Sequence, residues 1–299
     1  MAIPLTPLRA FHLTARHQSV SKAAVQLGVT QPAVTQQIRR LERAVSLRLF
    51  RREGRGLVLT EAGETLAVFA QRIFLLVDAA GDALEGVAGL RTGHLAVGAS
   101  RTAGSYYVAA LLDRFKRRYP GVRVSLAVAN SQIILARVTD FTLHAGVVAG
   151  LPADPHLIAR PLIRDRLLAV LAPAHPLGRK RVFSVDDLRG QPLVLREPGS
   201  TTRRLIEEAF AARGLAVTAA MELEDNEAIK SAVADGIGVA IMARAAVAQD
   251  VASGRVLGRR LRGAPSLDFA LVYHRDRVFS PVLSAFLALL PKVQGARKA

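Results

Sequence analysis

The chain of 299 residues contains no cysteine. Disulfide frameworks, thiolate zinc sites and cysteine nucleophiles are therefore excluded, and nothing indicates an oxidising compartment. The sequence also lacks the roughly 18 consecutive uncharged apolar residues that a membrane-spanning helix needs, and its first residues do not form a charged segment followed by a long apolar one. We expect a cytoplasmic protein that does not bind membranes.

The motifs of common enzyme classes are also absent. The sequence has no Gly-x-Ser-x-Gly elbow, no Walker loop and no His-Glu-x-x-His pair, and its seven histidines never fall at metal-ligand spacing. The stretch "GIGVA", 236–240, follows a predicted helix and precedes an apolar run, the wrong order for a dinucleotide-binding loop. Gly236 is therefore expected to end a helix. We expect no catalytic activity, no cofactor and no metal.

Acidic residues are scarce in the first part of the chain. Residues 1–60 hold ten basic side chains and two acidic ones, whereas residues 61–90 hold one basic and five acidic. The whole chain has a formal net charge of +17, and excess arginine and lysine most often neutralise phosphates. The first 60 residues are the part expected to contact a polyanion.

Apolar residues at helical spacing predict three short helices in this basic region. The first has an apolar face made of Leu8, Phe11, Leu13 and Ala15. Ser21 is expected to cap a second helix that ends at Leu27, and Gly28 supplies the turn. Thr30 can cap the third helix, with Pro32 in its first turn, where a missing N–H costs nothing.

The third helix has a narrow apolar stripe and a broad polar face. The stripe consists of Val34, Ile38, Leu41 and Val45, and the other faces carry Gln31, Thr35, Gln36, Arg39, Arg40 and Arg43. Short hydrogen-bonding side chains near a helix N-terminus suit base edges, and arginines along its flank suit phosphates. The pattern predicts a helix-turn-helix whose second helix enters a major groove. An ordinary solvated helix pair is the alternative.

Two further elements follow the helix-turn-helix. The stretch "RLFRREGRGLVLT", 48–60, predicts a β-hairpin wing whose Arg51, Arg52 and Arg55 would reach phosphates or the minor groove. Thr60 then caps a long helix that extends to about residue 90, with apolar residues at steps of three and four. The residues expected to pair this helix with its copy are Leu66, Phe69, Ile73, Leu76 and Leu84. The alternative is that the helix packs on its own domain.

From residue 91 onward, apolar runs alternate with helical stretches, which predicts an α/β sheet with crossover helices. Ligands of such sheets lie beyond the C-terminal ends of strands, against helix N-termini. Two loops fit that position, "GASRTAG" at 98–104 and "REPGSTTRR" at 196–204. Their hydroxyls and arginines predict that a small anion or carboxylate is held between them, although hydroxyls at such junctions also serve as helix caps.

The segment from Ser19 to Gly63 resembles the N-terminal module of the LysR-type transcriptional regulators. The resemblance rests on Ala23-Ala24, Gln31-Pro32-Ala33-Val34, Leu41-Glu42, Leu49-Phe50 and Leu59-Thr60-x-Ala62-Gly63, and a weaker likeness extends over nearly the whole chain. It implies an all-α winged helix-turn-helix, a homodimer or homotetramer, and binding to double-stranded DNA. The residues expected to contact DNA are Ser21, Gln31, Pro32, Thr35, Gln36, Arg39, Arg51, Arg52 and Arg55. One departure is Val45-Ser46, where the family usually has Leu-Gly.

The same resemblance implies a C-terminal α/β domain similar to periplasmic binding proteins, with a cleft between two subdomains. The expected division is a DNA-binding domain at 1–60, a linker helix at 61–90 and an effector-binding domain at 91–299. Its subdomains would be 91–161 plus 265–299, and 162–264, crossed by the strands "RPLIRD" and "RGAPS". The residues expected to bind a small-molecule effector are Ser100, Arg101, Thr102, Asn130, Ser131, Thr201 and Thr202. His144 replaces an acidic residue common in the family, and is either a sensor near neutral pH or a satisfied structural histidine.

Two functional hypotheses follow. In the first, the protein is a LysR-type transcription regulator whose C-terminal domain binds a small anionic effector and modulates promoter binding or activation. In the second, it is a metabolite-binding protein whose basic N-terminal module serves partner docking or nonspecific nucleic-acid association. Only the first hypothesis predicts a sequence preference that depends on Gln31 and Thr35.

Overall fold

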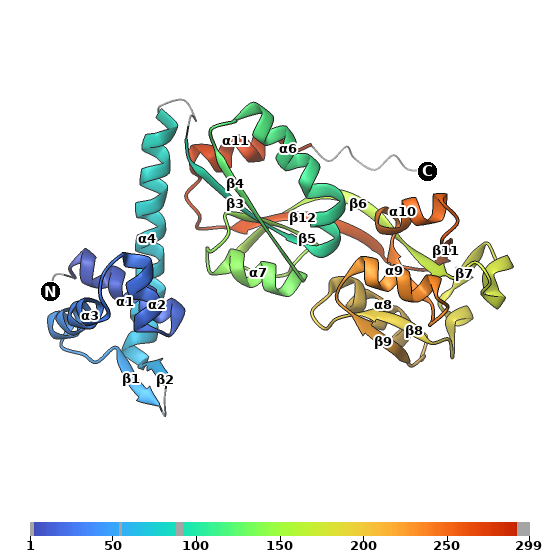
Figure 1. Cartoon of the computed structure of the whole chain (residues 1–299), viewed down its shortest axis with the longest axis horizontal. Helices are drawn as coiled ribbons and strands as arrows, with labels where there is room; N and C mark the ends of the chain where they lie inside the picture. The colour runs from blue at the N-terminus through green and yellow to red at the C-terminus, as the bar shows by residue number, and fades with distance from the viewer. Residues whose placement is uncertain (1–2, 54–55, 88–91, 292–299) are drawn as a thin grey trace. The chain divides into compact units, whose positions relative to one another are not determined.

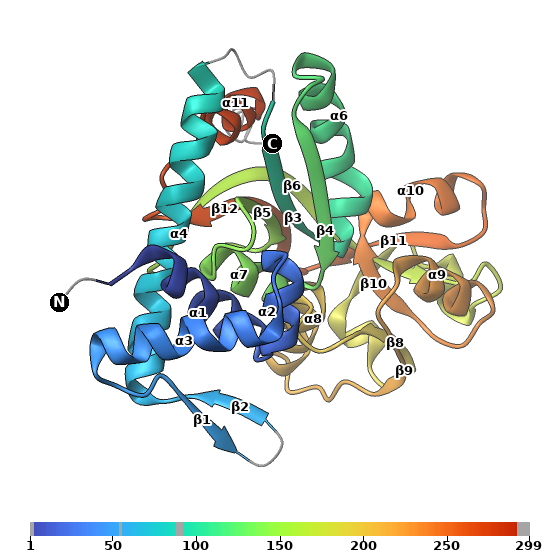
Figure 2. The same cartoon turned by 60° about the vertical axis from the view of Figure 1, so that its left-hand side comes forward.

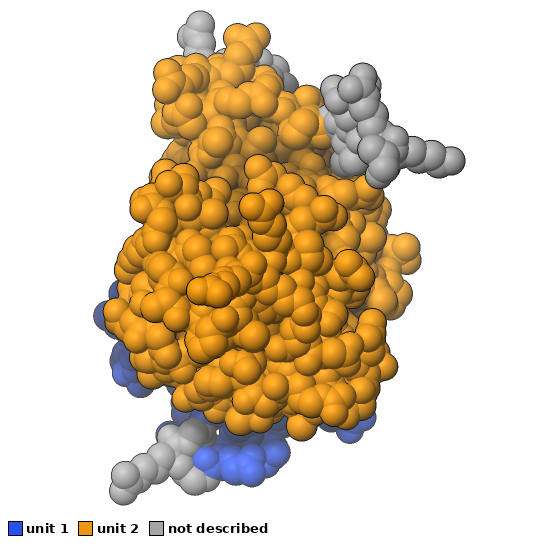
Figure 3. Space-filling view, turned by 90° about the vertical axis from the view of Figure 1, so that its right-hand side faces the viewer, with its two compact units in different colours: residues 1–81 blue, residues 82–299 orange. Residues whose placement is uncertain are grey.

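The structure is a computed structural model that describes residues 3–53, 56–87 and 92–291. The chain forms two compact units, residues 1–81 and residues 82–299, coloured separately in Figure 3. We call them the N-terminal unit and the effector unit and describe each by itself. Over the described residues, no helix has the length and apolar character that crossing a membrane requires.

The N-terminal unit contains three short helices, a β-hairpin and the first part of a long helix (Figure 1). Its elements are α1 (Leu5–His17), α2 (Val20–Leu27), α3 (Gln31–Val45), β1 (Phe50–Glu53), β2 (Gly56–Leu59) and α4 (Glu61–Val87). The apolar stripe of α3 is buried as expected, with Val34 and Ile38 against α2 and Leu41 against α1 and α4. Burial of these side chains is the main driving force for packing the three helices.

The predicted helix ends are confirmed except for one cap. Gly28 ends α2 with φ at 66°, and the Thr30 hydroxyl accepts the Ala33 N–H at 3.4 Å. The cap of α2 is Ser19 and not Ser21, because Ser19 has extended backbone and its hydroxyl accepts the Lys22 N–H at 3.3 Å. The helix therefore begins two residues earlier than expected, and Ser21 lies in its first turn.

The wing and the start of the long helix agree with the prediction. Strands β1 and β2 pair antiparallel, with Phe50 opposite Leu59. The Thr60 hydroxyl accepts the Gly63 N–H at 3.0 Å and so caps α4. Arg55 lies outside the described residues.

The effector unit is built around a mixed sheet in the order β4-β3-β5-β12-β6-β11-β7, with β10 also paired to β6. The strands are β3 (His94–Ser100), β4 (Arg123–Ala129), β5 (Ala145–Ala149), β6 (Leu157–Leu171), β7 (Val182–Ser184), β10 (Ala240–Ala243), β11 (Leu257–Arg262) and β12 (Ser266–His274). A separate parallel pair is formed by β8 (Leu193–Arg196) and β9 (Ala219–Leu223). Strands β3, β4 and β5 are mutually parallel, as the alternation of strands and helices predicts.

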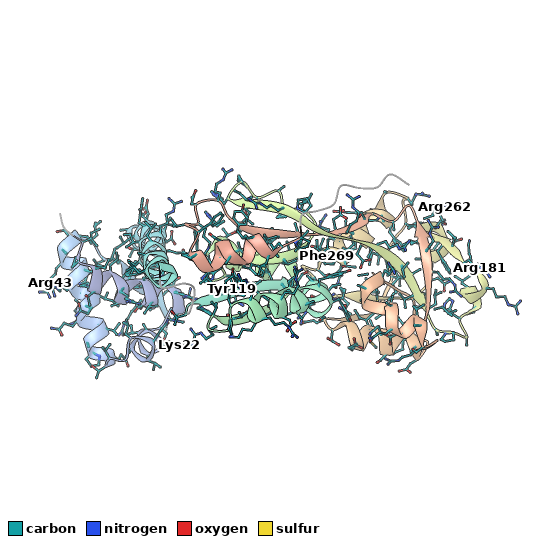
Figure 4. The ribbon with its side chains drawn as sticks, turned by 90° about the horizontal axis from the view of Figure 1, so that it is seen from above. Lys22, Arg43, Tyr119, Arg181, Arg262 and Phe269 are labelled. Carbon is teal, nitrogen blue, oxygen red and sulfur yellow. The ribbon has the colours of Figure 1, made fainter. Side chains whose placement is uncertain are left out.

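Helices cover both faces of the β3-β4-β5-β12 part of the sheet (Figures 1 and 2). The helices of the unit are α5 (Arg101–Ala103), α6 (Ala109–Arg118), α7 (Ser131–Thr139), α8 (Thr201–Ala211), α9 (Asn226–Ala234), α10 (Arg244–Ala252) and α11 (Pro281–Leu289), with η1 (Gly104–Val108), η2 (Pro176–Arg179) and η3 (Val185–Leu188) as short segments. Successive β3 residues point to opposite faces, so Leu95 and Val97 join the core with α6 and α11 while Ala96 packs with α7. Phe269 is fully buried within this unit (Figure 4).

The long strand β6 links two groups of strands. It pairs with β12 from Leu157 to Arg166 and then with β10 and β11 from Leu167 to Leu171. The expected crossing strand at 160–165 is thus part of β6. The prediction of a second crossing strand at "RGAPS" is wrong, because Gly263 has a φ of 75° and residues 263–265 form a turn before β12. The proposed subdomain boundaries remain a prediction.

The helix expected at 104–118 starts three residues earlier and contains a π-helical segment. Residues Arg101–Ala103 are α-helical, η1 is π-helical and α6 completes the run. Single π turns inside α-helices occur often at functional sites. Here the segment directly follows the first loop expected to bind an effector.

Candidate functional site

The start of α3 exposes the side chains expected to read bases. Gln31, Pro32, Gln36 and Arg39 are exposed, and Thr35 is half-buried. The Ser21 hydroxyl donates to Gln31 Oε1 at 3.3 Å, and the Thr35 hydroxyl donates to the Gln31 carbonyl at 3.1 Å. The structure thus brings the predicted residues of α2 and α3 together on one surface.

Basic side chains surround this surface, and they differ in their pairing. Lys22 and Arg43 are exposed on the N-terminal unit (Figure 4). On the wing, Arg51 forms an ion pair with Glu53 at 2.9 Å, whereas Arg52 has no ion pair with any residue that the structure describes. Arg52 is therefore the wing cation more available to a phosphate.

A buried carboxylate holds the wing against α3. Glu42 accepts the backbone N–H of Leu49 at 2.9 Å and an Arg48 guanidinium hydrogen bond at 3.1 Å. Sequence reasoning noted Glu42 only as part of a family motif. A signal was present, because Glu42 is one of two acidic residues in the first 60 and follows Leu41 of the apolar stripe.

The apolar side chains of α4 divide between two environments. Leu66 and Ile73 pack against the core of the N-terminal unit, beside the buried Ala70 and Phe74. The other three residues expected at a dimer interface are exposed: Phe69 by 55%, Leu76 by 56% and Leu84 by 75%. The alternative that α4 packs on its own domain thus applies to one face of the helix, and the other face has no partner within the described chain.

A small cavity lies at the carboxyl ends of the parallel strands of the effector unit, where ligands of α/β sheets bind. Its free volume is about 10 Å³. The lining residues are Ser100, Arg101, Thr102, Asn130, Ser131, Ala149, Arg196, Ser200, Thr201 and Thr202. All seven residues that the sequence predicted for effector binding are among them. We call this space the effector cavity.

Sequence reasoning missed three of the lining residues, Ala149, Arg196 and Ser200. Ser200 and Arg196 lie in the quoted loop at 196–204, but the residues carried over from the family were Thr201 and Thr202. Ala149 ends β5, parallel to β3. The parallel arrangement, once predicted, could have located it.

Three helices begin at the effector cavity. The continuous run of α5, η1 and α6 starts at Arg101, α7 starts at Ser131 with Asn130 as its cap, and α8 starts at Thr201 with Ser200 as its cap. Helix N-termini carry partial positive charge and free N–H groups. In addition, the buried Ser100 hydroxyl, with 5% of the residue exposed, has no hydrogen-bond partner among the described residues.

The two arginines of the cavity are held by carboxylates. Arg196 donates two hydrogen bonds to Glu197, at 2.8 and 3.0 Å, and a third to Asn226 at 3.2 Å. Arg101 forms ion pairs with Glu197, at 3.5 Å, and with Glu224. Any anion that recruits either guanidinium must compete with these carboxylates, so the hydroxyls and helix N-termini are the freer donors.

Contacts join the two sides of the cleft around the cavity. Besides the Arg101 ion pairs, the Tyr106 hydroxyl donates to Glu227 at 3.3 Å and the Asn130 amide donates to the Pro198 carbonyl at 3.4 Å. These contacts connect residues 100–131 with residues 197–227. The cleft is therefore closed at this point, which agrees with the small volume of the cavity.

A wider groove continues from the effector cavity and shares Ser131, Ala149, Ser200 and Thr201 with it. The groove has a volume of about 490 Å³. Its further lining residues are Gln132, Leu135, Gly150, Leu151, Pro152, Pro198, Gly199, Arg203, Arg204 and Glu207. The polar cavity thus opens into a space that can take a larger molecule.

His144 lies outside the cavity, beside β3. Its Nδ1 accepts the backbone N–H of Ala96 at 3.1 Å. Burial lowers the pKa of His144 to about 3, with additional effects of the Arg277 charge and of His94. His144 is therefore neutral at physiological pH. Of the two interpretations, the structure supports a structural histidine whose ring is hydrogen-bonded, and not a sensor that titrates near neutral pH.

Comparison with known proteins decides the family. The family model described as "Bacterial regulatory helix-turn-helix protein, lysR family" matches residues 5–64, and the family model "LysR substrate binding domain" matches residues 88–294. The chain belongs to the LysR family. Members of this family regulate transcription and are not enzymes, so the prediction of a non-enzymatic DNA-binding regulator is confirmed.

Individual LysR relatives resemble the whole chain. The transcriptional regulator CbbR of Rhodospirillum rubrum is 35% identical, over 96% of this chain and 95% of its own length. A full-length OxyR variant from Pseudomonas aeruginosa has a TM-score of 0.77 at 22% identity, covering 97% of this chain and 94% of that chain. The regulatory domain of CcmR from Synechocystis, solved in complex with 2-PG, has a TM-score of 0.61 at 26% identity over 66% of this chain and 94% of that chain.

Proposed function

We propose that this LysR-type regulator controls transcription in response to a small anionic effector that binds in the effector cavity. The observation that carries the proposal is the meeting of three helix N-termini and six hydroxyl side chains around one enclosed space. Backbone N–H groups and hydroxyls at helix N-termini are suited to phosphate and carboxylate oxygens. The unpartnered Ser100 hydroxyl adds a donor that an effector oxygen would satisfy.

The size of the site supports an effector with two parts. The effector cavity itself has room for little more than a water molecule, whereas the adjoining groove is about 490 Å³. We infer that the anionic group enters the cavity and the rest of the effector extends into the groove, with the cleft opening slightly to admit it. The CcmR domain, which was solved with 2-PG, supports a small ligand in a domain of this fold.

On the N-terminal unit, we propose that α3 enters the major groove of operator DNA. Gln31, Pro32, Thr35 and Gln36 would face base edges, supported by Ser21 through its contact with Gln31. Arg39, Arg51 and Arg52 would contact phosphates. Arg51 must give up its Glu53 partner to do so, so we assign Arg52 the larger contribution.

We further propose that the protein acts as a homodimer or homotetramer. The exposed Phe69, Leu76 and Leu84 of α4 support a helix pairing between two copies, because large exposed apolar side chains at this spacing are typical of an interface. A dimer presents two recognition helices and so doubles the length of DNA that is read.

The proposal is tested with the full-length protein and the duplex upstream of its own gene, against a scrambled duplex of equal length at two salt concentrations. We expect a preference for the native duplex that persists at the higher salt and is lost in Gln31→Ala. A panel of small carboxylates, phosphate esters and inorganic oxyanions is then screened for a change in DNA affinity or footprint.

The cleft is tested with Thr102→Val, which should abolish the effector response and leave DNA affinity nearly unchanged. Thr218→Val, an exposed threonine outside the cavity, is the control. Equal loss of DNA affinity and effector response in Thr102→Val would contradict the assignment of the cleft.

In the duplex experiment, equal binding of the native and scrambled duplexes that disappears at the higher salt would instead support nonspecific association.

A further inference from the structure

The effector unit has a second large cavity, located where β6 changes its pairing from β12 to β10 and β11. Its volume is about 470 Å³. The lining residues are Arg164, Asp165, Arg166, Leu167, Leu168, Arg244, Arg260, Leu261, Ala264, Pro265 and Ser266. None of them lines the effector cavity or its groove. We call this second space the crossover pocket.

Four arginines line the crossover pocket, and three of them form no ion pair with a described residue. Arg164 forms an ion pair with Asp268 at 3.4 Å. Arg166, Arg244 and Arg260 form no ion pair or side-chain hydrogen bond with any residue in the described part of the chain. By contrast, Arg203 and Arg204 on α8 are each paired with a glutamate four residues later.

The single acidic residue of the pocket is already engaged. Asp165 Oδ2 accepts the Tyr107 hydroxyl at 2.8 Å and the Ala245 N–H at 3.1 Å. Its Oδ1 accepts the backbone N–H of Arg166 at 2.7 Å. Asp165 therefore stabilises backbone and a tyrosine and makes no hydrogen bond to an arginine side chain of the pocket, although its negative charge offsets one of the four positive charges.

The walls of the pocket combine apolar and charged side chains. Leu167 is buried and Leu168 and Leu261 are half-buried, whereas the four arginines are exposed and so reach a ligand from solvent. Helix α10 begins at Arg244, and the Asp165 carboxylate caps its first turn by accepting the Ala245 N–H. The carboxylate therefore offsets the positive end of this helix, and the positive charge of the pocket comes from its arginines.

We propose that the crossover pocket binds a small polyanion, a molecule with two or more phosphate or carboxylate groups, independently of the effector cavity. The four arginines and the one aspartate that line the pocket carry a formal net charge of +3 (4 − 1), and a ligand with several negative charges reduces the repulsion among the guanidinium groups. Each guanidinium can donate two parallel hydrogen bonds to one phosphate or carboxylate group, which gives arginine its preference for such ligands. A singly charged anion would satisfy only one of the three.

The test uses inorganic pyrophosphate as the probe and titration calorimetry of the full-length protein at low salt. We expect saturable binding that is much tighter than that of chloride. The double variant Arg166→Gln with Arg260→Gln should bind roughly 100-fold more weakly, since each lost charged hydrogen-bond donor costs about tenfold or more. The matched control is Arg181→Gln with Arg189→Gln, which removes the same charge from exposed positions outside the pocket. Arg244→Gln serves as a second variant if the double variant fails to fold.

The effector cavity could also take pyrophosphate, so the same titration is made on Thr102→Val, which alters the cavity and leaves the crossover pocket intact. Retained binding in Thr102→Val, together with loss in the double variant, supports the crossover pocket. The proposal is overturned if the wild-type protein does not bind pyrophosphate or if Thr102→Val loses the binding. It is also overturned if the pocket double variant and the control double variant weaken pyrophosphate binding equally. It is also overturned if the double variant binds pyrophosphate normally and instead loses affinity for DNA.

Discussion

The carboxylate of Glu42, near the C-terminal end of α3, accepts the backbone N–H of Leu49 at 2.9 Å, immediately before the wing. Glu42 is buried and also holds Arg48. Helix α3 and the residue that precedes the wing are therefore joined by a charged hydrogen bond rather than by apolar packing alone. The orientation of the two proposed DNA-contacting elements depends on this residue.

We expect Glu42→Gln to destabilise the N-terminal unit by about 1 to 3 kcal/mol, because the variant loses charge-assisted hydrogen bonds in a buried position. Urea denaturation of the full-length protein measures this loss, and DNA affinity should fall in parallel. Glu53→Gln is the control, because Glu53 is exposed and pairs only with the exposed Arg51. Equal stability of the two variants would show that the Glu42 contact contributes little.

Gly63, in the first turn of α4, approaches the Leu49 carbonyl so closely that a Cβ atom would lie 2.1 Å from the carbonyl oxygen. We expect Gly63→Ala to destabilise the unit by at least about 2 kcal/mol, because the backbone of Leu49 must move. Gly81→Ala in the same helix has no atom within 4 Å of its new Cβ and should stabilise the helix by about 0.5 to 1 kcal/mol. Thermal unfolding of both variants tests the contrast, and a stable Gly63→Ala protein would contradict it.

Ser46 ends α3 in the left-handed conformation, with φ at 56°. A residue with a Cβ atom is strained there, and the family usually has glycine at this position. We expect Ser46→Gly to increase the free energy of unfolding by about 0.5 to 1 kcal/mol. The reverse change, Gly28→Ala at φ 66° with no neighbour within 4 Å, should decrease it by a similar amount. A stability loss in Ser46→Gly would refute the strain argument.

The lowered pKa of His144 predicts loss of stability in mild acid. Since its pKa is about 3 in the folded protein and 6.5 without burial, the unfolded state binds more protons between these two values. The contribution is complete above pH 6.5 and declines as pH falls, by up to about 1.4 kcal/mol per pH unit. The measurement is the free energy of unfolding at pH 7.5 and at pH 5.5. His144→Asn, which keeps an acceptor for Ala96, should reduce the difference by about 1 kcal/mol, and an unchanged difference would argue against a neutral His144.

Gly199 combines a positive φ of 84° with contact across the cleft, because a Cβ atom there would lie 2.9 Å from the Gln132 amide oxygen and 3.0 Å from the Asn130 amide nitrogen. We expect Gly199→Ala to hold the cleft more open and to speed hydrogen exchange in residues 197–204. Gly190→Ala has a similar φ of 70° and no neighbour within 4 Å, so it reports backbone strain alone. Equal exchange in this loop for both variants would exclude a role of Gly199 in closure.

Local sequence signals were sufficient for the order of the elements. Thr30, Gly28 and Thr60 act through neighbours within a few residues, so their capping and turn roles follow from residue type and position. The choice of Ser21 as a cap was wrong because two serines lie two residues apart and either can begin a helix. The prediction of a strand at "RGAPS" was wrong because residues 263–265 form a turn, and both Gly263 and Pro265 are unfavourable within a strand.

Contacts between distant segments required the tertiary structure. Ser100, Asn130 and Thr201, all proposed to bind the effector, come from three separate loops. Their position between strands and helices predicted that the loops at 98–104 and 196–204 meet, whereas Asn130 was predicted from the family resemblance alone. Which cations form ion pairs was also not predictable, because Arg101 meets Glu224 from 123 residues away, while Arg166, Arg244 and Arg260 line one pocket without an ion pair to any described residue.

The sequence by itself thus determined the helices, the wing, the alternation of strands and helices and the basic N-terminal region, because helix caps, turns and apolar periodicity act over a few residues. Tertiary structure alone decided the burial of Glu42, the neutral state of His144, the enclosure of the effector cavity and the charge of the crossover pocket. These properties depend on distances and burial between residues far apart in the chain, and electrostatic energies vary steeply with both.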